Sequence, residues 1–154
     1  MGKSMYRKNY GAITLVLEDW FGIRHSSVLG DKAETAFGIW DTGNSKTVIS
    51  SELARRLGID TTGESHLRGS SFGQGMATSA TVNISIGEDV IPMVEVDVIS
   101  FASDEHYDVI LGMDVIARGR FEVDSTNGAT VLAFEPIRDD DGQIPILRFV
   151  YDEN

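Results

Sequence analysis

The sequence predicts one all-β domain that carries one or two short helices. Strand-like apolar runs are short, and turn residues separate them about every ten positions, which is typical of a sandwich or barrel. The 154 residues suit one domain with a core of its own, so we expect a single domain over residues 1–154. Only residues 52–57 and 113–118 combine an apolar helical pattern with a glycine that ends it.

The first half of the chain alternates strand patterns with one capped helix. Strands are expected at residues 13–17, 36–40 and 47–49, which are apolar or β-branched. Ser50 or Ser51 can cap the helix over residues 52–57, and Gly58 ends it. Leu53 and Leu57 then share one face of that helix.

The second half contains further strand patterns around a second short helix. Strands are expected at residues 81–86, 94–98, 107–111, 121–123, 130–134 and 144–150. In the second of these, Val94, Val96 and Val98 alternate with Glu95 and Asp97. This alternation predicts the partner strand of residues 81–86. The helix over residues 113–118 should end at a glycine.

Composition excludes several classes of function. The formal charge of −11 disfavours binding to nucleic acids and to anionic membrane surfaces. There is no cysteine, so a thiol nucleophile and a thiolate metal site are excluded. No apolar run is long enough to cross a bilayer, and the N-terminus lacks the apolar core of a signal peptide. We expect a cytoplasmic protein that needs no metal or cofactor.

One motif points to chemistry. Asp41-Thr42-Gly43 follows directly on the apolar run 36–40. We expect that strand to be buried on both faces and to deliver Asp41 into a half-buried loop. The triplet alone is also an ordinary turn sequence. Its context is more specific, because a second apolar strand ends at Ile110-Leu111-Gly112 about 65 residues later, just before the second helix.

These two motifs at this spacing resemble the retropepsin-like aspartic proteases, the retroviral-type family with bacterial relatives. In that family an apolar strand leads into D-[ST]-G, and a second strand ends in Ile-Leu-Gly before a short helix. The resemblance covers roughly residues 36–123. It implies a retropepsin-like acid protease half-barrel that is active as a homodimer.

The resemblance also implies roles for individual residues. Asp41 corresponds to the catalytic aspartate, and the Thr42 hydroxyl to the group that bonds across the dimer. The Gly43 backbone is expected to lie against substrate, with Asn44 supporting the loop. Leu111 and Gly112 belong to the strand that passes behind that loop. The glycine-rich stretch 69–75 corresponds to the flap, a mobile hairpin that closes over the peptide, with candidate residues Gly69, Phe72, Gly73 and Gly75.

The chain departs from the family pattern at three positions. Asn44 stands where the family has Ala or Ser, and Trp40 is bulkier than the usual aliphatic residue before the aspartate. Met113 replaces an arginine that braces the retroviral dimer, whereas Asp114 keeps the polar character of its position. These departures concern the cleft and the dimer rather than the fold.

The number of motifs implies the assembly. Aspartic proteases use two carboxylates about 3 Å apart, which share one proton and so supply an acid and a base together. This chain has one such triplet, so a twofold axis must bring a second Asp41 from another copy. Residues 13–17 and 144–150 are candidate interface strands by analogy. We expect a homodimeric aspartic endopeptidase that binds an extended peptide or protein segment.

Other readings compete with this one. The same fold can serve as a catalytically silent peptide-binding or scaffolding dimer, or the chain can be an unrelated β-barrel with a plain turn at Asp41. Residues 69–73 match G-x-S-x-G, but a serine hydrolase needs a helix after that motif and a longer chain. The three histidines are too far apart in sequence to suggest a metal site.

Overall fold

The computed structural model describes residues 12–19, 33–61, 63, 65–70, 73–102, 104–128, 130–142 and 144. Its strands are β1 (Ala12–Asp19), β2 (Ala33–Trp40), β3 (Val48–Ser50), β4 (His66–Ser70), β5 (Gly73–Ile86), β6 (Asp89–Ile99), β7 (Val109–Leu111), β8 (Gly119–Asp124) and β9 (Val131–Pro136). The two helices of these ranges are α1 (Ser51–Arg56) and α2 (Met113–Ile116).

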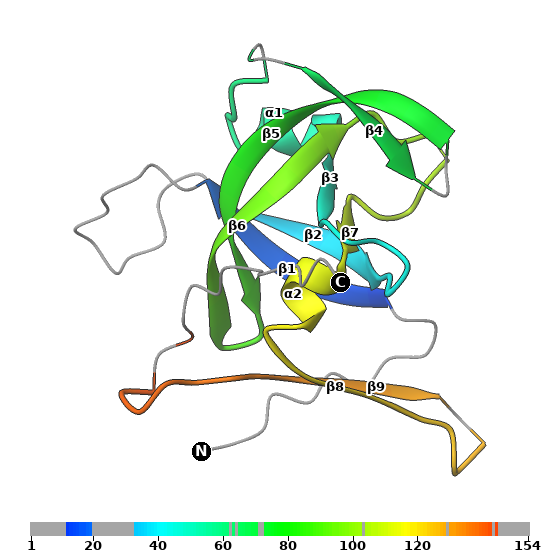
Figure 1. The fold of residues 1–154 in the computed structure, drawn as a ribbon, viewed down its shortest axis with the longest axis vertical. Helices are drawn as coiled ribbons and strands as arrows, with labels where there is room; N and C mark the ends of the chain where they lie inside the picture. Colours follow the sequence, from blue (N-terminus) through cyan, green and yellow to red (C-terminus); the bar gives the residue numbers. More distant parts are fainter. Residues whose placement is uncertain are drawn as a thin grey trace, which may run out of the picture.

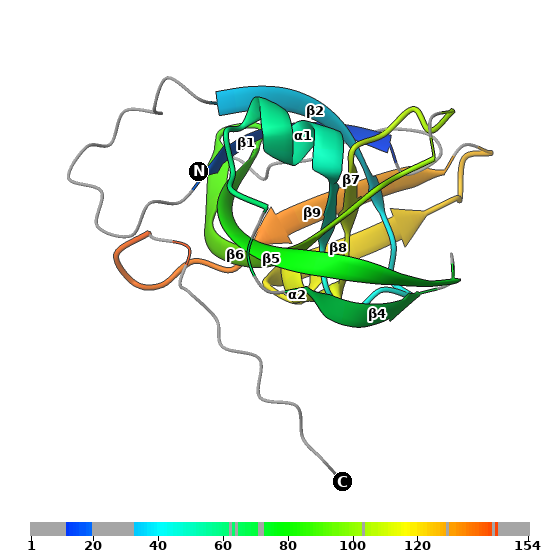
Figure 2. The ribbon, with the colours of Figure 1, turned by 90° about the horizontal axis from the view of Figure 1, so that it is seen from above.

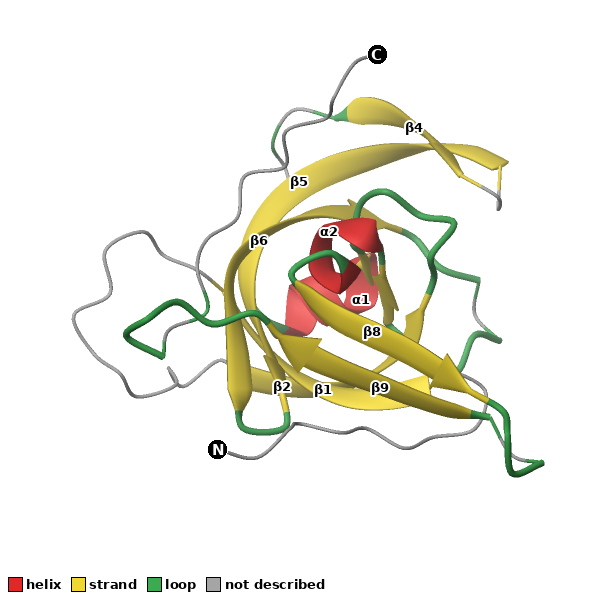
Figure 3. Cartoon of the chain, turned by 60° about the horizontal axis from the view of Figure 1, so that its bottom comes forward, coloured by secondary structure: helices red, strands yellow, loops and turns green. Residues whose placement is uncertain are grey.

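The described strands form a closed barrel with one added strand. A seven-stranded sheet runs in the order β1-β2-β7-β3-β6-β5-β4, and β1 also pairs with β5, which closes the first six strands into a ring. The long strand β5 bends around the barrel and continues past it together with β4 (Figures 1 and 3). The all-β fold class with short helices is thus confirmed.

A separate hairpin covers one end of the barrel. Strands β8 and β9 form a two-stranded sheet that crosses this end next to α2, which contacts β8 (Figure 3). The Trp40 ring lies 5.2 Å from the rings of both Phe121 and Phe134 on the hairpin. A Cβ at Gly119 would lie 2.2 Å from the Glu135 carbonyl oxygen. Gly119 therefore allows β8 to approach β9 closely, and it begins β8 instead of ending a helix over residues 113–118.

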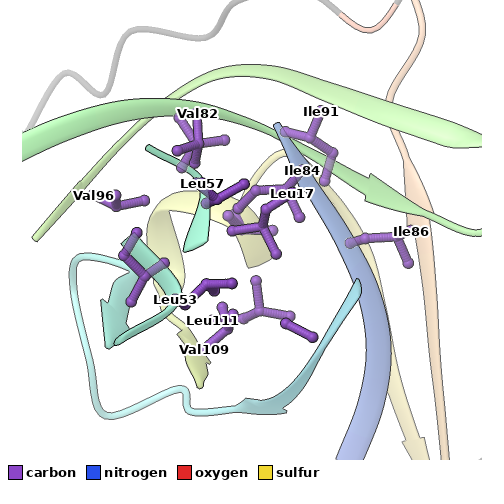
Figure 4. Packing of buried hydrophobic residues seen from close by; sticks show 14 of the residues in the cluster. Leu17, Leu53, Leu57, Val82, Ile84, Ile86, Ile91, Val96, Val109 and Leu111 are labelled. Carbon is purple, nitrogen blue, oxygen red and sulfur yellow. The ribbon is translucent and has the colours of Figure 1, made fainter. Parts of the chain in front are cut away.

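The core fills the barrel and extends to α1. Leu17, Leu53, Leu57 and Leu111 are fully buried and lie in one cluster with the apolar side chains of β5 and β6 (Figure 4). Helix α1 contacts β2, β3 and β6, and it lies beside β2 when the molecule is seen from above (Figure 2). As expected, α1 begins at a serine cap, since the Leu53 N–H donates to the Ser50 hydroxyl at 3.0 Å.

The structure differs from two expectations, one about the burial of β2 and one about β1 as an interface strand. Strand β2 is not buried on both faces, because Phe37 is 56% exposed between the buried Ala36 and Gly38. Strand β1 pairs with β2 on one edge and with β5 on the other over residues 16–18. These positions therefore have no free edge for a partner strand. The other candidate interface strand, residues 144–150, lies outside the described residues apart from residue 144, which is in no regular element.

A matched pair of leucines tests the account of the core. Leu53 is fully buried, whereas Leu67 on β4 is 67% exposed. We expect Leu53→Ala to lower the free energy of unfolding by about 2–5 kcal/mol, because it removes buried methyl groups and leaves a cavity. Leu67→Ala should change it by less than about 0.5 kcal/mol. Denaturant titration of both variants measures this, and equal losses contradict the assignment of the core.

Candidate active site

The loop at residues 41–47 carries the Asp41 side chain out of β2. The Asp41 N–H donates to the Leu111 carbonyl at 2.9 Å, so the parallel pairing of β2 with β7 continues into the loop. The Gly43 N–H donates to Asp41 Oδ1 at 2.9 Å, and the Asn44 N–H to the Asp41 carbonyl at 3.2 Å. Asp41 is half-buried, as expected, while Thr42 and Gly43 are exposed. The turn thus orients one carboxylate next to an accessible tip.

Helix α2 holds this loop from behind through its own backbone. The Met113 N–H donates to the Asn44 carbonyl at 2.7 Å, and the Asp114 N–H donates to the Ser45 carbonyl at 3.2 Å. The first N–H groups of a helix have no partners within the helix. Here the loop carbonyls accept those bonds, which attaches the Asp41 loop to the start of α2.

A second contact between α2 and the loop runs through Thr47. The Asp114 carboxylate accepts from the Thr47 hydroxyl at 2.6 Å and from the Thr47 N–H at 3.0 Å. The Thr47 hydroxyl in turn accepts from the Gly112 N–H at 3.1 Å. Thr47 is fully buried. Both ends of the loop are therefore fixed to the junction of β7 and α2.

Close packing explains the glycine at that junction. A Cβ at Gly112 would lie 2.7 Å from the Asn44 carbonyl oxygen and 2.9 Å from the Lys46 carbonyl carbon. Both atoms belong to backbone that cannot move without shifting the loop. Gly112 has a φ of −92°, which any residue adopts, so the constraint is one of space alone.

The β4–β5 hairpin extends past the barrel on the side of the Asp41 loop (Figure 1). Gly69 pairs with Gln74, and Ser70 pairs with Gly73. A Cβ at Gly75 would meet nothing within 4 Å. Phe72, expected at the flap tip, lies outside the described residues. The glycine-rich stretch thus forms a hairpin with open space beside one of its glycines.

A cluster of charges lies between the hairpin and the Asp41 loop. The Asp97 side chain on β6 is 4% exposed and pairs with Arg68, with Lys46 at 3.0 Å and with His66 at 3.1 Å. Asp97 is therefore buried, whereas Glu95 on the same strand is exposed. A carboxylate tolerates burial here because two cations from different segments, Arg68 on β4 and Lys46 in the Asp41 loop, pair with it.

The cluster shifts two pKa values in opposite directions. Burial alone raises the pKa of Asp97, but the hydrogen bonds and charges of Arg68 and Lys46 outweigh it and hold that pKa below its ordinary value of 3.8. Burial also lowers the pKa of Lys46, but the bonds and charges of Asp97 and Glu95 outweigh it, so this pKa is raised. Both partners are therefore charged near neutral pH.

An open pocket lies beside β7. It has a volume of about 270 Å³ and is lined mainly by apolar atoms of residues 99–102 and of Glu105, Tyr107 and Ile110. Burial, the Glu105 carboxylate and the charge of Asp41 raise the pKa of Tyr107. Ile110 in the lining pairs with Ile39 on β2, two positions before Asp41, so the pocket adjoins the strand that leads into the Asp41 loop.

Sequence reasoning missed the residues that support this loop. No pattern in the sequence assigns a role to Thr47, Arg68 or Asp97, and Asp114 stands out only as a polar position. The spacing of His66 and Arg68 places both side chains on one face only once residues 66–70 are known to form a strand, so the sequence gives no independent signal. No group of three or more metal-binding side chains occurs among the described residues. In that same part of the chain, no helix is long and apolar enough to span a membrane.

Gly112→Ala tests the packing behind the loop. The added methyl group collides with backbone at Asn44 and Lys46, so we expect a loss of about 1–3 kcal/mol in the free energy of unfolding. Gly63→Ala is the matched control, because a Cβ there meets nothing within 4 Å. Urea unfolding compares the two, and a Gly112 variant as stable as the Gly63 variant contradicts the close approach.

The Asp97 cluster predicts a loss of stability in acid. A carboxylate whose pKa is lower in the folded state stabilises the fold at pH values above its unfolded pKa, and this contribution is lost as the pH falls through the folded pKa. We expect the free energy of unfolding to fall below about pH 4, where Asp carboxylates begin to take up protons. Asp97→Asn should reduce this slope, and the exposed control Asp140→Asn should not. Equal slopes across pH 2–6 contradict the assignment.

Comparisons with known proteins bear on the family. A family model described as "gag-polyprotein putative aspartyl protease" matches residues 32–118, which are 87 of the 154 residues. No curated protein matches the chain. The crystal structure of a retropepsin-like aspartic protease from Rickettsia conorii is similar, with a TM-score of 0.54 and 17% sequence identity over 85% of this chain and 88% of that one. At this identity the likeness concerns the fold.

The matched region begins just before β2 and ends just after α2, so it contains the Asp41 loop, the β4–β5 hairpin and the junction that holds the loop. Since it covers more than half of the chain, this protein belongs to the gag-polyprotein aspartyl protease family and has the retropepsin-like fold.

Proposed function

We propose that this protein is an aspartic endopeptidase that acts as a homodimer, with one Asp41 carboxylate from each copy. The observation that carries the proposal is the Asp41 loop itself. It presents a half-buried carboxylate, oriented by the Gly43 N–H, on a loop that β7 and α2 hold in place. Such fixed orientation is what acid–base catalysis requires of its groups.

The need for a second copy follows from the chemistry. One carboxylate cannot act as base toward water and as acid toward the peptide at the same moment. Two that lie about 3 Å apart share one proton and supply both roles. The chain carries a single D-[ST]-G triplet. Exposure of Thr42 and Gly43 at the tip of the loop supports the approach of a second loop along a twofold axis.

In the proposed reaction, the ionised Asp41 takes a proton from a water molecule whose oxygen bonds to the peptide carbonyl carbon. The protonated Asp41 of the other copy gives its proton to the carbonyl oxygen, which yields a neutral gem-diol. The carboxylate that gave up its proton then takes one from a diol hydroxyl. The other carboxyl group, which took its proton from water, gives it to the peptide nitrogen, and the C–N bond breaks. The products are a carboxylic acid and an amine, and the pair again holds one proton.

The substrate is an extended peptide bound between the Asp41 loops and the β4–β5 hairpins, which act as flaps. Extended peptides bind through main-chain hydrogen bonds, with side chains entering pockets on alternate sides. Gly69, Phe72, Gly73 and Gly75 belong to the flap in this proposal. The open pocket at residues 99–102 and Tyr107 accommodates an apolar side chain, because its lining is mainly apolar.

A catalytically silent dimer is the competing function. Asn44 and Trp40 suggested it, because both depart from the family pattern next to Asp41. Each has a local role in the structure, since Asn44 accepts a bond from Arg68 and Trp40 packs on the β8–β9 hairpin. Neither departure therefore favours the silent function over the peptidase.

Asp41→Asn tests the catalytic role. The amide cannot act as base or acid, so we expect cleavage of a mixed peptide pool to fall by more than about 10²-fold, the lower range for acid–base catalysis. Mass spectrometry of the fragments measures this, and circular dichroism checks the fold. The control Asp140→Asn makes the same change at an exposed turn and should cleave like the parent. Cleavage retained by Asp41→Asn removes the assignment, and peptide binding by the parent without fragments favours the silent dimer.

A further inference from the structure

Arg68 on β4 makes the contacts that connect the hairpin to the Asp41 loop. Its side chain is 9% exposed, and its guanidinium forms three interactions. Nη1 donates to the Asp97 carboxylate. Nη2 donates to Asn44 Oδ1 at 2.7 Å and to the Lys46 carbonyl at 3.1 Å. One buried side chain of the hairpin therefore binds both a side chain and the backbone of the loop.

The position of β4 makes this contact important. Among the described strands, β4 is at the end of the sheet and pairs with β5 alone. Backbone pairing thus leaves the hairpin attached to the barrel along one edge only. The side chains of Arg68 and His66 cross from β4 to Asp97 on β6. Arg68 alone of these two also reaches the loop at residues 41–47.

Asn44 accepts the hydrogen bond that Arg68 donates to the loop side chain. It is 8% exposed, its carbonyl accepts from α2 and its side-chain oxygen accepts from Arg68. Asn44 is three positions after Asp41, and the turn bond from its N–H to the Asp41 carbonyl joins the two. Arg68 is thus connected through Asn44 to the turn that orients the Asp41 carboxylate.

We infer that Arg68 is a positioning residue that couples the β4–β5 hairpin to the Asp41 loop, so that closure of the hairpin over a peptide and orientation of the carboxylate occur together. This inference rests on the proposed peptidase function for its kinetic consequence, but the coupling itself is a property of the fold. Arginine suits the task because its planar fork binds two acceptors in fixed directions, whereas a lysine ammonium is a single point charge.

A purely structural ion pair is the alternative. Buried salt bridges contribute little to stability on balance, although removing one partner is destabilising. Loss of stability after mutation of Arg68 therefore does not demonstrate coupling. The test needs a control arginine with similar bonds elsewhere. Arg138 fits, because its guanidinium binds the buried carboxylate of Asp89 and the Gly142 carbonyl, and it lies beyond β9.

The experiment compares Arg68→Lys with Arg138→Lys in the full chain. Both substitutions keep the positive charge and remove the fork. Hydrogen exchange measured by mass spectrometry on peptides covering residues 41–47 reports on the loop without requiring turnover. We expect Arg68→Lys to accelerate exchange there by about tenfold or more, which is a loss of about 1.4 kcal/mol of local protection, and Arg138→Lys to leave it unchanged. Equal exchange in the two variants overturns the coupling.

Steady-state kinetics of peptide cleavage provide a second test of the coupling. We expect Arg68→Lys to lower kcat by about tenfold or more, because misplacing a catalytic group slows the chemical step. KM should change by a smaller factor. In the double variant Arg68→Lys, Asn44→Ala, the loss in kcat/KM should be smaller than the product of the two single losses. Multiplicative losses contradict the coupling. If the parent chain cleaves nothing, the peptidase proposal fails while the exchange arm still decides the role of Arg68.

Discussion

The attachment of the Asp41 loop to the junction of β7 and α2 is the constraint on which the rest of this structure depends. Backbone N–H groups of α2 bind the loop carbonyls, and Asp114 binds Thr47 at the far end of the loop. Gly112 has no side chain, so the two backbones can approach within contact distance. Because short-range packing fixes both ends of the turn, the position of the Asp41 carboxylate follows from the barrel rather than from the flexibility of a loop.

Local patterns in the sequence predict the parts of the fold that local physics determines. Ser50 and Gly58 bracket α1, because a serine side chain caps the first turn of a helix and a glycine with a φ of +72° suits the position after its last turn. The resemblance to retropepsins, rather than local physics, implies that the strand ending at Gly112 passes behind the Asp41 loop, and the pairing of β2 with β7 agrees with this. Strand β4 was missed, because His66 to Ser70 contain no β-branched residue and no apolar alternation.

The charged support of the site could not be predicted for a different reason. Alternation along β6 places Asp97 on the face opposite the buried valines, and in most sheets that face is solvated. Here β4 brings Arg68 and His66 over that face, so that a tertiary contact overrides the pattern. Trp40 is a similar case. Its size is explained by the β8–β9 hairpin, which lies about 80 residues further along the chain and packs two aromatic rings against it.

The central claim is that one chain supplies only half of a catalytic pair. The most direct test measures the rate of peptide cleavage per mole of chain as a function of protein concentration, alongside sedimentation velocity on the same samples. If catalysis requires two copies, this specific rate is near zero where the chain sediments as a monomer, rises as dimers form and levels off when dimers predominate. A specific rate that stays constant down to concentrations where only monomers sediment would contradict it.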